Sequence, residues 1–228
     1  MSERHDDTRR RLLEAAGEVF AEKGFQAATV REICSRAGVN VAAVNYYFGD
    51  KQRLYVEVVR FAHKEDEEQP LPRWLPGTPA GQKLRDFVEQ MLVNLHSEHV
   101  PLWGRRLMMR EMAEPTEACI AMMDAFVRPR AELLQRILGE LLPPDMPEVD
   151  RHLIASSIVG QCLFHRVHQP IVKLLASDGL YESFTVARLA EHITRFSLAA
   201  LGCGPAVGEP AAIAAWEDSP DLQDRAVR

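Results

Sequence analysis

The chain has 228 residues, of which 46% are hydrophobic and 26% charged, and its formal net charge is −6 at pH 7. These values are ordinary for a globular protein and exclude a disordered chain. The first residues contain no apolar signal region, and no uncharged run approaches the roughly 18 residues that a membrane span needs. We therefore expect a cytoplasmic protein with no membrane partner.

The charge is unevenly distributed along the sequence. Residues 1–64 contain 11 Lys and Arg against 9 Asp and Glu, which leaves 16 and 24 for the remainder of the chain. A mildly basic N-terminal quarter on an acidic body is compatible with binding phosphates at one end only. The overall acidity argues against indiscriminate binding of nucleic acid.

Helical periodicity dominates the N-terminal quarter. Apolar residues predict a helix over 8–23, which Gly24 ends. Thr29 is predicted to cap a second helix, with Glu32 completing a capping box, and Gly38 to end it. A short third helix is expected over 40–48 with Val41, Val44 and Phe48 inward, and Asp50 is expected to cap a fourth helix over 51–67.

The rest of the chain is also predicted to be helical. The stretch QPLPRWLPGTPAG, residues 69–81, holds four prolines and two glycines and therefore marks a connector. Further helices are expected over 78–99, 102–113, 116–142 with a break near Pro129, 148–168 and 184–201. Since no alternating strand pattern is present, the fold class is predicted to be all-α, with domains at 1–60 and 61–203 and a Pro/Ala-rich tail at 204–228.

The two short helices, preceded by the longer supporting helix, are predicted to form a tri-helical unit of helix-turn-helix type, in which the second short helix would read DNA. Its outward residues combine small side chains for close approach, an amide that can read a base edge and phenols that can donate to phosphates. With the flanking positions, the predicted DNA-binding set is Thr29, Arg31, Asn40, Ala42, Ala43, Asn45, Tyr46, Tyr47 and Lys51. The alternative is that the two tyrosines are core aromatics of a helical bundle.

The run TRRRLLEAAGEVFAEKGFQAATVREICSRAGVNVAAVNYYFGDKQRLYVEVV resembles the DNA-binding domain of the tetracycline-repressor (TetR) family. The resemblance implies that Thr29 and Tyr46 contact phosphates and that Lys51 assists at the start of the fourth helix. It also implies that Asn40, Ala42, Ala43 and Asn45 face the major groove. The commonest family pattern has Ser or Thr, Gly-Thr and His where this chain has Asn40, Ala42, Ala43 and Tyr47, so no operator sequence is predicted.

The larger helical region is expected to hold a small-molecule chamber. The segment WGRRLMMREMAEPTEACIAMMDAFVRPR resembles the ligand-domain segment of a TetR subgroup, and its Met and aromatic residues offer adaptable apolar walls beside cations. The predicted ligand-binding residues are Trp103, Arg106, Met109, Arg110, Phe126, Gln161 and His165. The alternative is that these residues belong to an ordinary core.

A metal site is not predicted. Cys162, His165 and His168 are spaced three apart, but six residues turn a helix by about 600°, so the first and last side chains diverge by roughly 120°. All four cysteines, which include Cys34, Cys119 and Cys203, lack a C-x-x-C spacing and are expected to be reduced thiols. No cofactor is expected.

The last two long helices are predicted to form a homodimer interface, because each has more apolar surface than one internal face would use. The predicted interface residues are Leu153, Ser156, Gly160, Phe164, Leu189, Ile193, Phe196 and Ala200. The competing interpretation is that these residues close the core of the monomer.

The favoured function is a dimeric transcriptional regulator, a repressor that binds a palindromic operator in double-stranded DNA and is released by a small-molecule effector. The alternative is an all-helical enzyme or small-molecule carrier. Because the sequence contains no Gly-rich phosphate loop, nucleophile elbow or E-x-x-H di-iron pattern, catalysis is not predicted.

Overall fold

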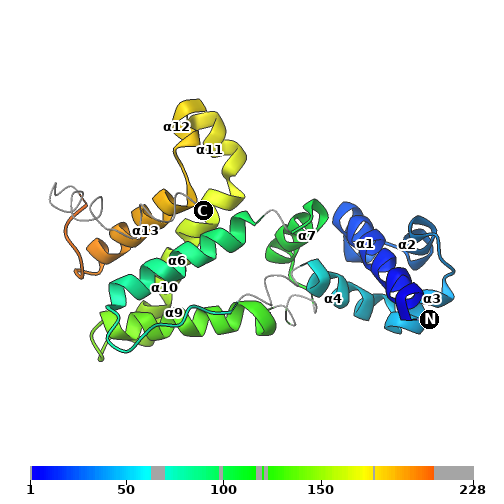
Figure 1. Ribbon diagram of the computed structural model, residues 1–228, viewed down its shortest axis with the longest axis horizontal. Coiled ribbons are helices and arrows are strands. Elements are labelled where there is room, and N and C mark those ends of the chain that lie inside the picture. Colours follow the sequence, from blue (N-terminus) through cyan, green and yellow to red (C-terminus); the bar gives the residue numbers. More distant parts are fainter. Residues whose placement is uncertain are drawn as a thin grey trace. The chain divides into compact units, whose positions relative to one another are not determined.

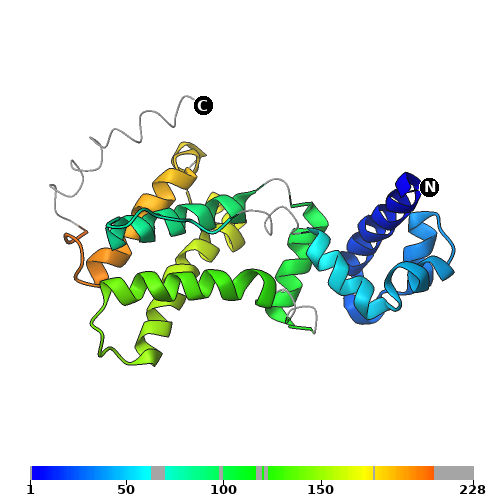
Figure 2. The same cartoon turned by 60° about the horizontal axis from the view of Figure 1, so that its bottom comes forward.

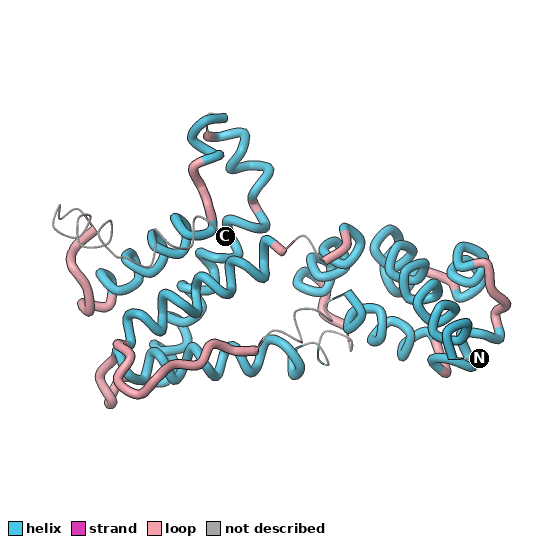
Figure 3. Tube along the Cα trace, in the orientation of Figure 1, coloured by secondary structure: helices cyan, strands magenta, loops and turns pink. Residues whose placement is uncertain are grey.

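The computed structural model describes residues 2–62, 70–97, 100–116, 120, 123–176 and 178–207. Across these residues the chain forms helices joined by loops, without a strand (Figure 3), and the predicted all-α class is confirmed. The chain divides into two compact units, one within residues 1–71 and 97–130 and the other within 72–96 and 131–228. Among the described helices, none combines the length and the apolar character that a membrane crossing demands.

The first unit begins with four helices, α1 (Ser2–Ala27), α2 (Val30–Ala37), α3 (Ala42–Phe48) and α4 (Lys51–Ala62), shown in Figure 1. Their inward faces meet in one apolar core that includes Phe20, Ile33, Val44, Leu54 and Val58. The tri-helical arrangement expected from the periodicity is therefore present, with α4 packed beside α3.

The predicted helix ends agree with the local hydrogen bonds. Gly24 has φ 77° and interrupts α1, although helical turns resume up to Ala27. The Thr29 hydroxyl accepts a hydrogen bond from the Glu32 amide at 3.2 Å, and the Asp50 carboxylate accepts one from the Arg53 amide at 2.8 Å. The Glu32 carboxylate extends to α1, where it pairs with Lys23 Nζ at 2.7 Å.

One expectation for α3 was wrong. The helix begins at Ala42 rather than at residue 40, so Val41 precedes it and is exposed instead of pointing inward. Val44 and Phe48 alone form the buried side of this short helix.

The helix α7 (Leu102–Ala113) also belongs to the first unit, where it packs along α1 and against α4. Trp103 covers Gly17, and a Cβ at Gly17 would overlap the indole ring. Arg110 covers Gly24, where a Cβ would be 2.8 Å from the guanidinium. Both pairs are separated by seven residues, about two helical turns, so the two helices run in the same direction in close contact.

The second unit contains α6 (Ala80–His96), α9 (Arg128–Leu141, from residue 131 onward), α10 (Glu148–Val167) and α13 (Val186–Ala200). Figure 2 shows α13 beside α6, and the two helices pack along one another. The Arg85 guanidinium approaches the Glu191 carboxylate at 3.6 Å between these helices. Burial raises the pKa of Glu191, while Arg85 and Arg195 oppose that rise.

Two short helices were not predicted. They follow α10: α11 (Gln169–Leu175) comes directly after the helix expected over 148–168, and α12 (Asp178–Glu182) lies before the helix expected over 184–201. The break expected near Pro129 lies slightly earlier, at a π-helical turn over Met123–Val127 that leads into α9. Of the tail predicted over 204–228, residues 208–228 lie outside the described part of the structure.

The contact between Gly17 and Trp103 generates a stability prediction. Gly17→Ala should lower the free energy of unfolding by about 1–3 kcal/mol, because the new methyl group would overlap the indole of Trp103, which would have to shift from its stacked position on Phe61. Gly139→Ala is the matched control, since nothing lies within 4 Å of a Cβ at this helical position, and it should stabilise by about 0.5–1 kcal/mol. Denaturant unfolding measures both changes. Equal effects of the two substitutions would contradict the described packing of α7 on α1.

Candidate nucleic-acid interface

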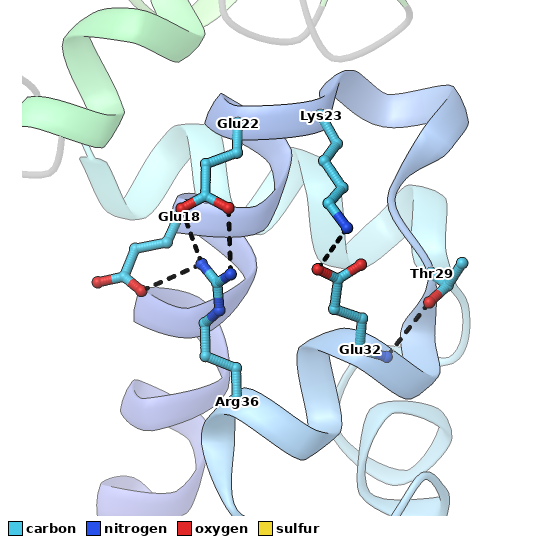
Figure 4. Close-up of polar contacts among 6 residues, drawn as sticks. All are labelled: Glu18, Glu22, Lys23, Thr29, Glu32 and Arg36. Atoms are coloured by element: carbon cyan, nitrogen blue, oxygen red, sulfur yellow. Dashed lines mark hydrogen bonds and ion pairs between the residues drawn. The ribbon is translucent and has the colours of Figure 1, made fainter.

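Ion pairs on both sides of α2 hold it against α1 (Figure 4). The Arg36 guanidinium contacts both oxygens of the Glu22 carboxylate at 3.1 Å and lies 3.5 Å from Glu18. The hydrogen bond from Arg36 lowers the pKa of Glu22. At the other end of α2, Lys23 pairs with Glu32. These contacts are at the surface, so their role is to fix the direction of α2 more than to add stability.

The outward face of α3 is largely uncharged and accessible. Tyr46 is 73% exposed, and Ala42 and Asn45 are exposed as well. Ala43 and Tyr47 were expected on the same face, but both are half-buried and pack against the apolar core. The exposed edge therefore combines a small residue, an amide and a phenol, which are the groups that a helix needs for close approach to a groove.

Asn40 has a local structural role that the sequence interpretation did not include. Its side-chain oxygen accepts a hydrogen bond from the Ala42 amide at 3.0 Å and so satisfies a donor at the start of α3. The Asn40 amide nitrogen remains the group of this side chain that could donate to a nucleic acid.

Lys51 is held by the backbone. Its ammonium donates to the carbonyls of Phe25 at 2.8 Å and Ala28 at 3.0 Å, lies 3.5 Å from the carbonyl of Gln26, and sits 4.5 Å above the Phe25 ring. These acceptors lie in the last residues of α1 and at Ala28 after it, called here the α1–α2 turn, so Lys51 joins this turn to the start of α4.

Thr29 and Arg31 are exposed at the start of α2. Because the Thr29 hydroxyl accepts its capping hydrogen bond, its own O–H is still able to donate to another group. The capping role of Thr29 is therefore compatible with the phosphate contact that the family resemblance implies.

The first turn of α1 adds residues that the sequence did not single out. His5 Nε2 lies 3.4 Å from the Tyr46 hydroxyl, and the His5 ring is 4.6 Å from the Tyr47 ring between centroids. Arg9 lies over the Phe48 ring at 5.5 Å and pairs with Glu57 at 2.6 Å. The i, i+4 spacing of His5 and Arg9 puts them on one face, but the sequence could not show that this face meets α3.

An open hollow follows α3 beside α1 and α4. Its lining carries three guanidinium groups and two carboxylates. The lining residues are Arg9, Tyr47, Phe48, Asp50, Gln52, Arg53, Val56, Glu57 and Arg60. Because the charges of both signs are interspersed, the hollow offers local cations without a uniformly basic surface.

The predicted ligand-binding residues are divided between the two units. Trp103, Arg106, Met109 and Arg110 lie on α7 in the first unit, where the Trp103 and Arg110 side chains pack against α1. Gln161 and His165 lie on α10 in the second unit. The side chain of Phe126 lies outside the described part of the structure. Trp103 and Arg110 thus have a packing role that a chamber lining does not explain.

His165 is half-buried in the second unit. Burial lowers its pKa, and the nearby His192 and His96 lower it further. Cys162, one turn earlier, is fully buried, and burial raises its pKa to about 12, which keeps the thiol protonated. Among the residues the structure describes, no three His, Cys, Asp or Glu side chains are grouped closely enough to hold a metal ion.

The predicted dimer residues fall into two groups. The α10 residues Leu153, Ser156, Gly160 and Phe164 are all exposed, as are Phe196 and Ala200 on α13. Leu189 and Ile193 are buried in the single chain, because this face of α13 packs on α6. These two residues therefore belong to the core of the single chain, as the competing interpretation predicted.

Comparison with known proteins matches both regions to regulatory families. Residues 80–201 match the family described as the C-terminal domain of the HTH-type transcriptional dual regulator CecR, and residues 12–58 match the bacterial regulatory proteins of the tetR family. A relative, the HTH-type transcriptional dual regulator CecR of Shigella flexneri, is 24% identical over 184 residues, which cover 76% of this chain and 82% of that protein.

Solved structures of similar fold agree with these matches. A HlyIIR mutant whose residues 169–186 are replaced by a linker with two thrombin sites superposes with a TM-score of 0.56 at 21% identity, covering 83% of this chain and 98% of that chain. SmeT, the repressor of the Stenotrophomonas maltophilia multidrug efflux pump SmeDEF, gives a TM-score of 0.54 at 21% identity and coverage of 85% and 91%. At 21% identity these similarities establish a shared fold and nothing further about function.

The environment of His165 generates a pH prediction. Because its folded-state pKa is lower than the ordinary 6.5, the unfolded chain binds this proton more readily, so the associated stability is present above about pH 6.5 and is lost as the pH falls. The melting temperature of the wild type should therefore fall more between about pH 7.5 and about pH 5.5 than that of His165→Gln. His152→Gln, at an exposed position of α10, is the control. The same pH dependence in His165→Gln and wild type would contradict the prediction.

Proposed function

The chain belongs to the TetR family of bacterial transcriptional regulators, with a C-terminal domain of the CecR type, and we propose that it binds a palindromic operator as a homodimer that a small-molecule effector releases. The protein is a DNA-binding regulator of transcription rather than an enzyme. We further propose a cytoplasmic location, because its target is chromosomal DNA.

The exposed edge of α3 is the observation that carries the proposal. Tyr46 and Asn45 extend from a helix whose opposite side is anchored in the core by Val44 and Phe48. A short helix with small and polar exposed residues is suited to the major groove. In this proposal Asn45 reads a base edge, Ala42 permits close approach and Tyr46 donates to a phosphate.

The proposed contacts to DNA phosphates come mainly from neutral hydrogen-bond donors of the protein. The DNA phosphates would be contacted by Thr29 and Arg31 at the start of α2 and by Tyr46 on α3. Asn40 would donate a further hydrogen bond through its amide nitrogen. Ala43 and Tyr47, which are half-buried, would contribute more to the shape of the surface than to hydrogen bonding. Because Lys51 is bonded to backbone carbonyls, we propose that it supports the reading helix mainly by holding the α1–α2 turn.

The homodimer is proposed through the exposed apolar stripe of α10. Leu153 and Phe164 are large apolar residues exposed on this helix, and Ser156 and Gly160 between them are small enough for another helix to approach closely. Phe196 and Ala200 extend the proposed surface to α13. Two subunits would place two reading helices on the two half-sites of a palindrome.

In this proposal the effector releases the dimer from DNA, because it binds the non-binding arrangement of the dimer better and so shifts the population away from the DNA-binding arrangement. Gln161 and His165 are the second-unit residues that support a chamber, since both are half-buried polar side chains on α10. Met109 and Arg106 on α7 remain candidates for contacting an effector, while Trp103 and Arg110 are occupied by their contacts with α1.

Repression is the proposed regulatory outcome. SmeT is named a repressor, as are NicS of Pseudomonas putida and AcnR of Corynebacterium efficiens. CecR is named a dual regulator, so activation at some promoters is the second candidate. A reporter gene under the selected operator would be expressed more strongly when the chain is absent if it represses, and less strongly if it activates.

The most informative test of the proposed function is selection of bound duplexes from a random DNA pool. The expected result is an inverted repeat whose two halves reflect the two-fold symmetry of the dimer. Recovery of no enriched sequence by the purified full-length chain would contradict specific operator binding.

Substitutions on α3 should separate affinity from specificity. Tyr46→Phe should weaken binding to all sequences to a similar extent, because it removes a phosphate donor, whereas Asn45→Ala should relax discrimination at one base pair by about 1–3 kcal/mol. Binding to the selected operator and to single-base variants, at fixed salt, measures both effects. Wild-type affinity and discrimination in a folded Asn45→Ala, Tyr46→Ala double variant would contradict the assignment of α3 as the reading helix.

The proposed dimer surface makes a separate prediction. Phe164→Glu should shift the sedimentation coefficient from dimer to monomer and weaken binding to the palindrome, because a monomer holds only one half-site. Val93→Glu is the matched control, since Val93 is a similarly exposed apolar residue on α6 and should leave the dimer intact. Two results together would rule the interface out: the free wild type sediments as a monomer at micromolar concentration, and one single chain binds each palindrome.

A further inference from the structure

A buried carboxylate on α7 reaches toward the helix-turn-helix. Glu111 is 1% exposed and accepts hydrogen bonds from the Tyr55 hydroxyl, from the Thr116 amide at 3.1 Å and from the Thr116 hydroxyl at 2.9 Å. A buried carboxylate is costly unless such donors surround it. Tyr55, Glu111 and Thr116 therefore form a satisfied buried network that includes α4, α7 and the segment after α7.

Tyr55 is the member of this network that lies on α4, the helix packed against α3. Its ring contacts the rings of Phe20 and Phe25, with centroids 4.8 and 5.1 Å away. Burial raises the pKa of Tyr55, and the hydrogen bond to Glu111 raises it further, so the hydroxyl remains a donor. The position of this ring is thus determined by apolar packing on its sides and by Glu111 at its tip.

The same face of α4 carries Lys51 one turn earlier. Lys51 holds the carbonyls of the α1–α2 turn, and Tyr55 is held by α7. Because α4 also packs against α3, the direction of α4 determines how α3 is supported. Fixing α4 at both of these side chains therefore fixes the reading helix.

We propose that Glu111 is a positioning residue for operator binding, which acts through Tyr55 to hold α4, and hence α3, in the DNA-binding arrangement. This inference rests on the proposed function. It assigns to the Arg110-Glu111 pair of α7 a role in the DNA-reading unit: Arg110 covers Gly24 of α1, while Glu111 anchors α4. Neither residue touches DNA in this mechanism.

A double-mutant cycle on operator affinity tests the proposal with the full-length protein and the selected operator. Tyr55→Phe and Glu111→Leu should each weaken binding by about tenfold, because the binding-competent fraction falls when α4 is released. The double variant should bind no more weakly than either single variant. Glu111→Gln keeps an oxygen acceptor for Tyr55 but turns an NH2 group toward the Thr116 amide, so it should bind the operator better than Glu111→Leu and less tightly than the wild type. The salt dependence of binding should stay unchanged, since no phosphate contact is lost.

Tyr181→Phe is the matched control, because it removes a tyrosine hydroxyl that is hydrogen-bonded to Gln169 in the second unit, and it should bind the operator as the wild type does. Affinities are corrected for the folded fraction measured by circular dichroism. If Glu111→Leu does not fold, Tyr55→Phe compared with Tyr181→Phe decides the matter.

Two outcomes would overturn the inference. Wild-type affinity in folded Tyr55→Phe and Glu111→Leu would reduce the network to a structural role, and additive losses in the double variant would exclude action through Tyr55. In both cases the wild type still binds its operator, so the proposed function stands. Absence of operator binding by the wild type itself would instead refute the proposed function, and this inference with it.

Discussion

The close contact between α7 and α1 is the constraint on which the first unit depends. Without side chains at Gly17 and Gly24, Trp103 and Arg110 lie directly on α1, two helical turns apart on both helices. This register brings Glu111 to the Tyr55 hydroxyl. The N-terminal helices are therefore held from outside their own sequence segment, and α7, which follows much later in the chain, is part of the unit that presents α3.

Much of the fold could be predicted because the strongest signals are local. The Thr29 and Asp50 caps act within one turn, and the structure has the expected helix starts there, while Gly24 interrupts α1 three residues before its end. The missed α11 illustrates the limit of this reasoning. Pro170 lies at the second position of this helix, where it removes no backbone hydrogen bond, so a proline there is compatible with the helix.

The sites were harder to predict because they depend on which helices meet. Periodicity showed that α13 has an apolar face at Leu189 and Ile193, but it could not show that α6 covers that face. The same limit applies to α7, where Arg110 was expected in a ligand chamber and instead contacts Gly24. For α3, spacing predicted the exposed Asn45 and Tyr46 but not the half-buried Tyr47. The local hydrogen bond of Asn40 depends on the exact start of the helix. The resemblance to the TetR family pointed to α3 as the reading helix, and this role and its DNA contacts remain predictions.

The central claim is that α7 unfolds cooperatively with the N-terminal helices, in particular with α1 and α4, on which it packs. Native-state hydrogen exchange of the full-length protein, followed by mass spectrometry across a denaturant series, tests this claim most directly. The amides of α7 should exchange with the same opening free energy and the same denaturant dependence as those of α1 and α4. Exchange of α7 at much lower opening free energy, with α1 and α4 still protected, would contradict the account.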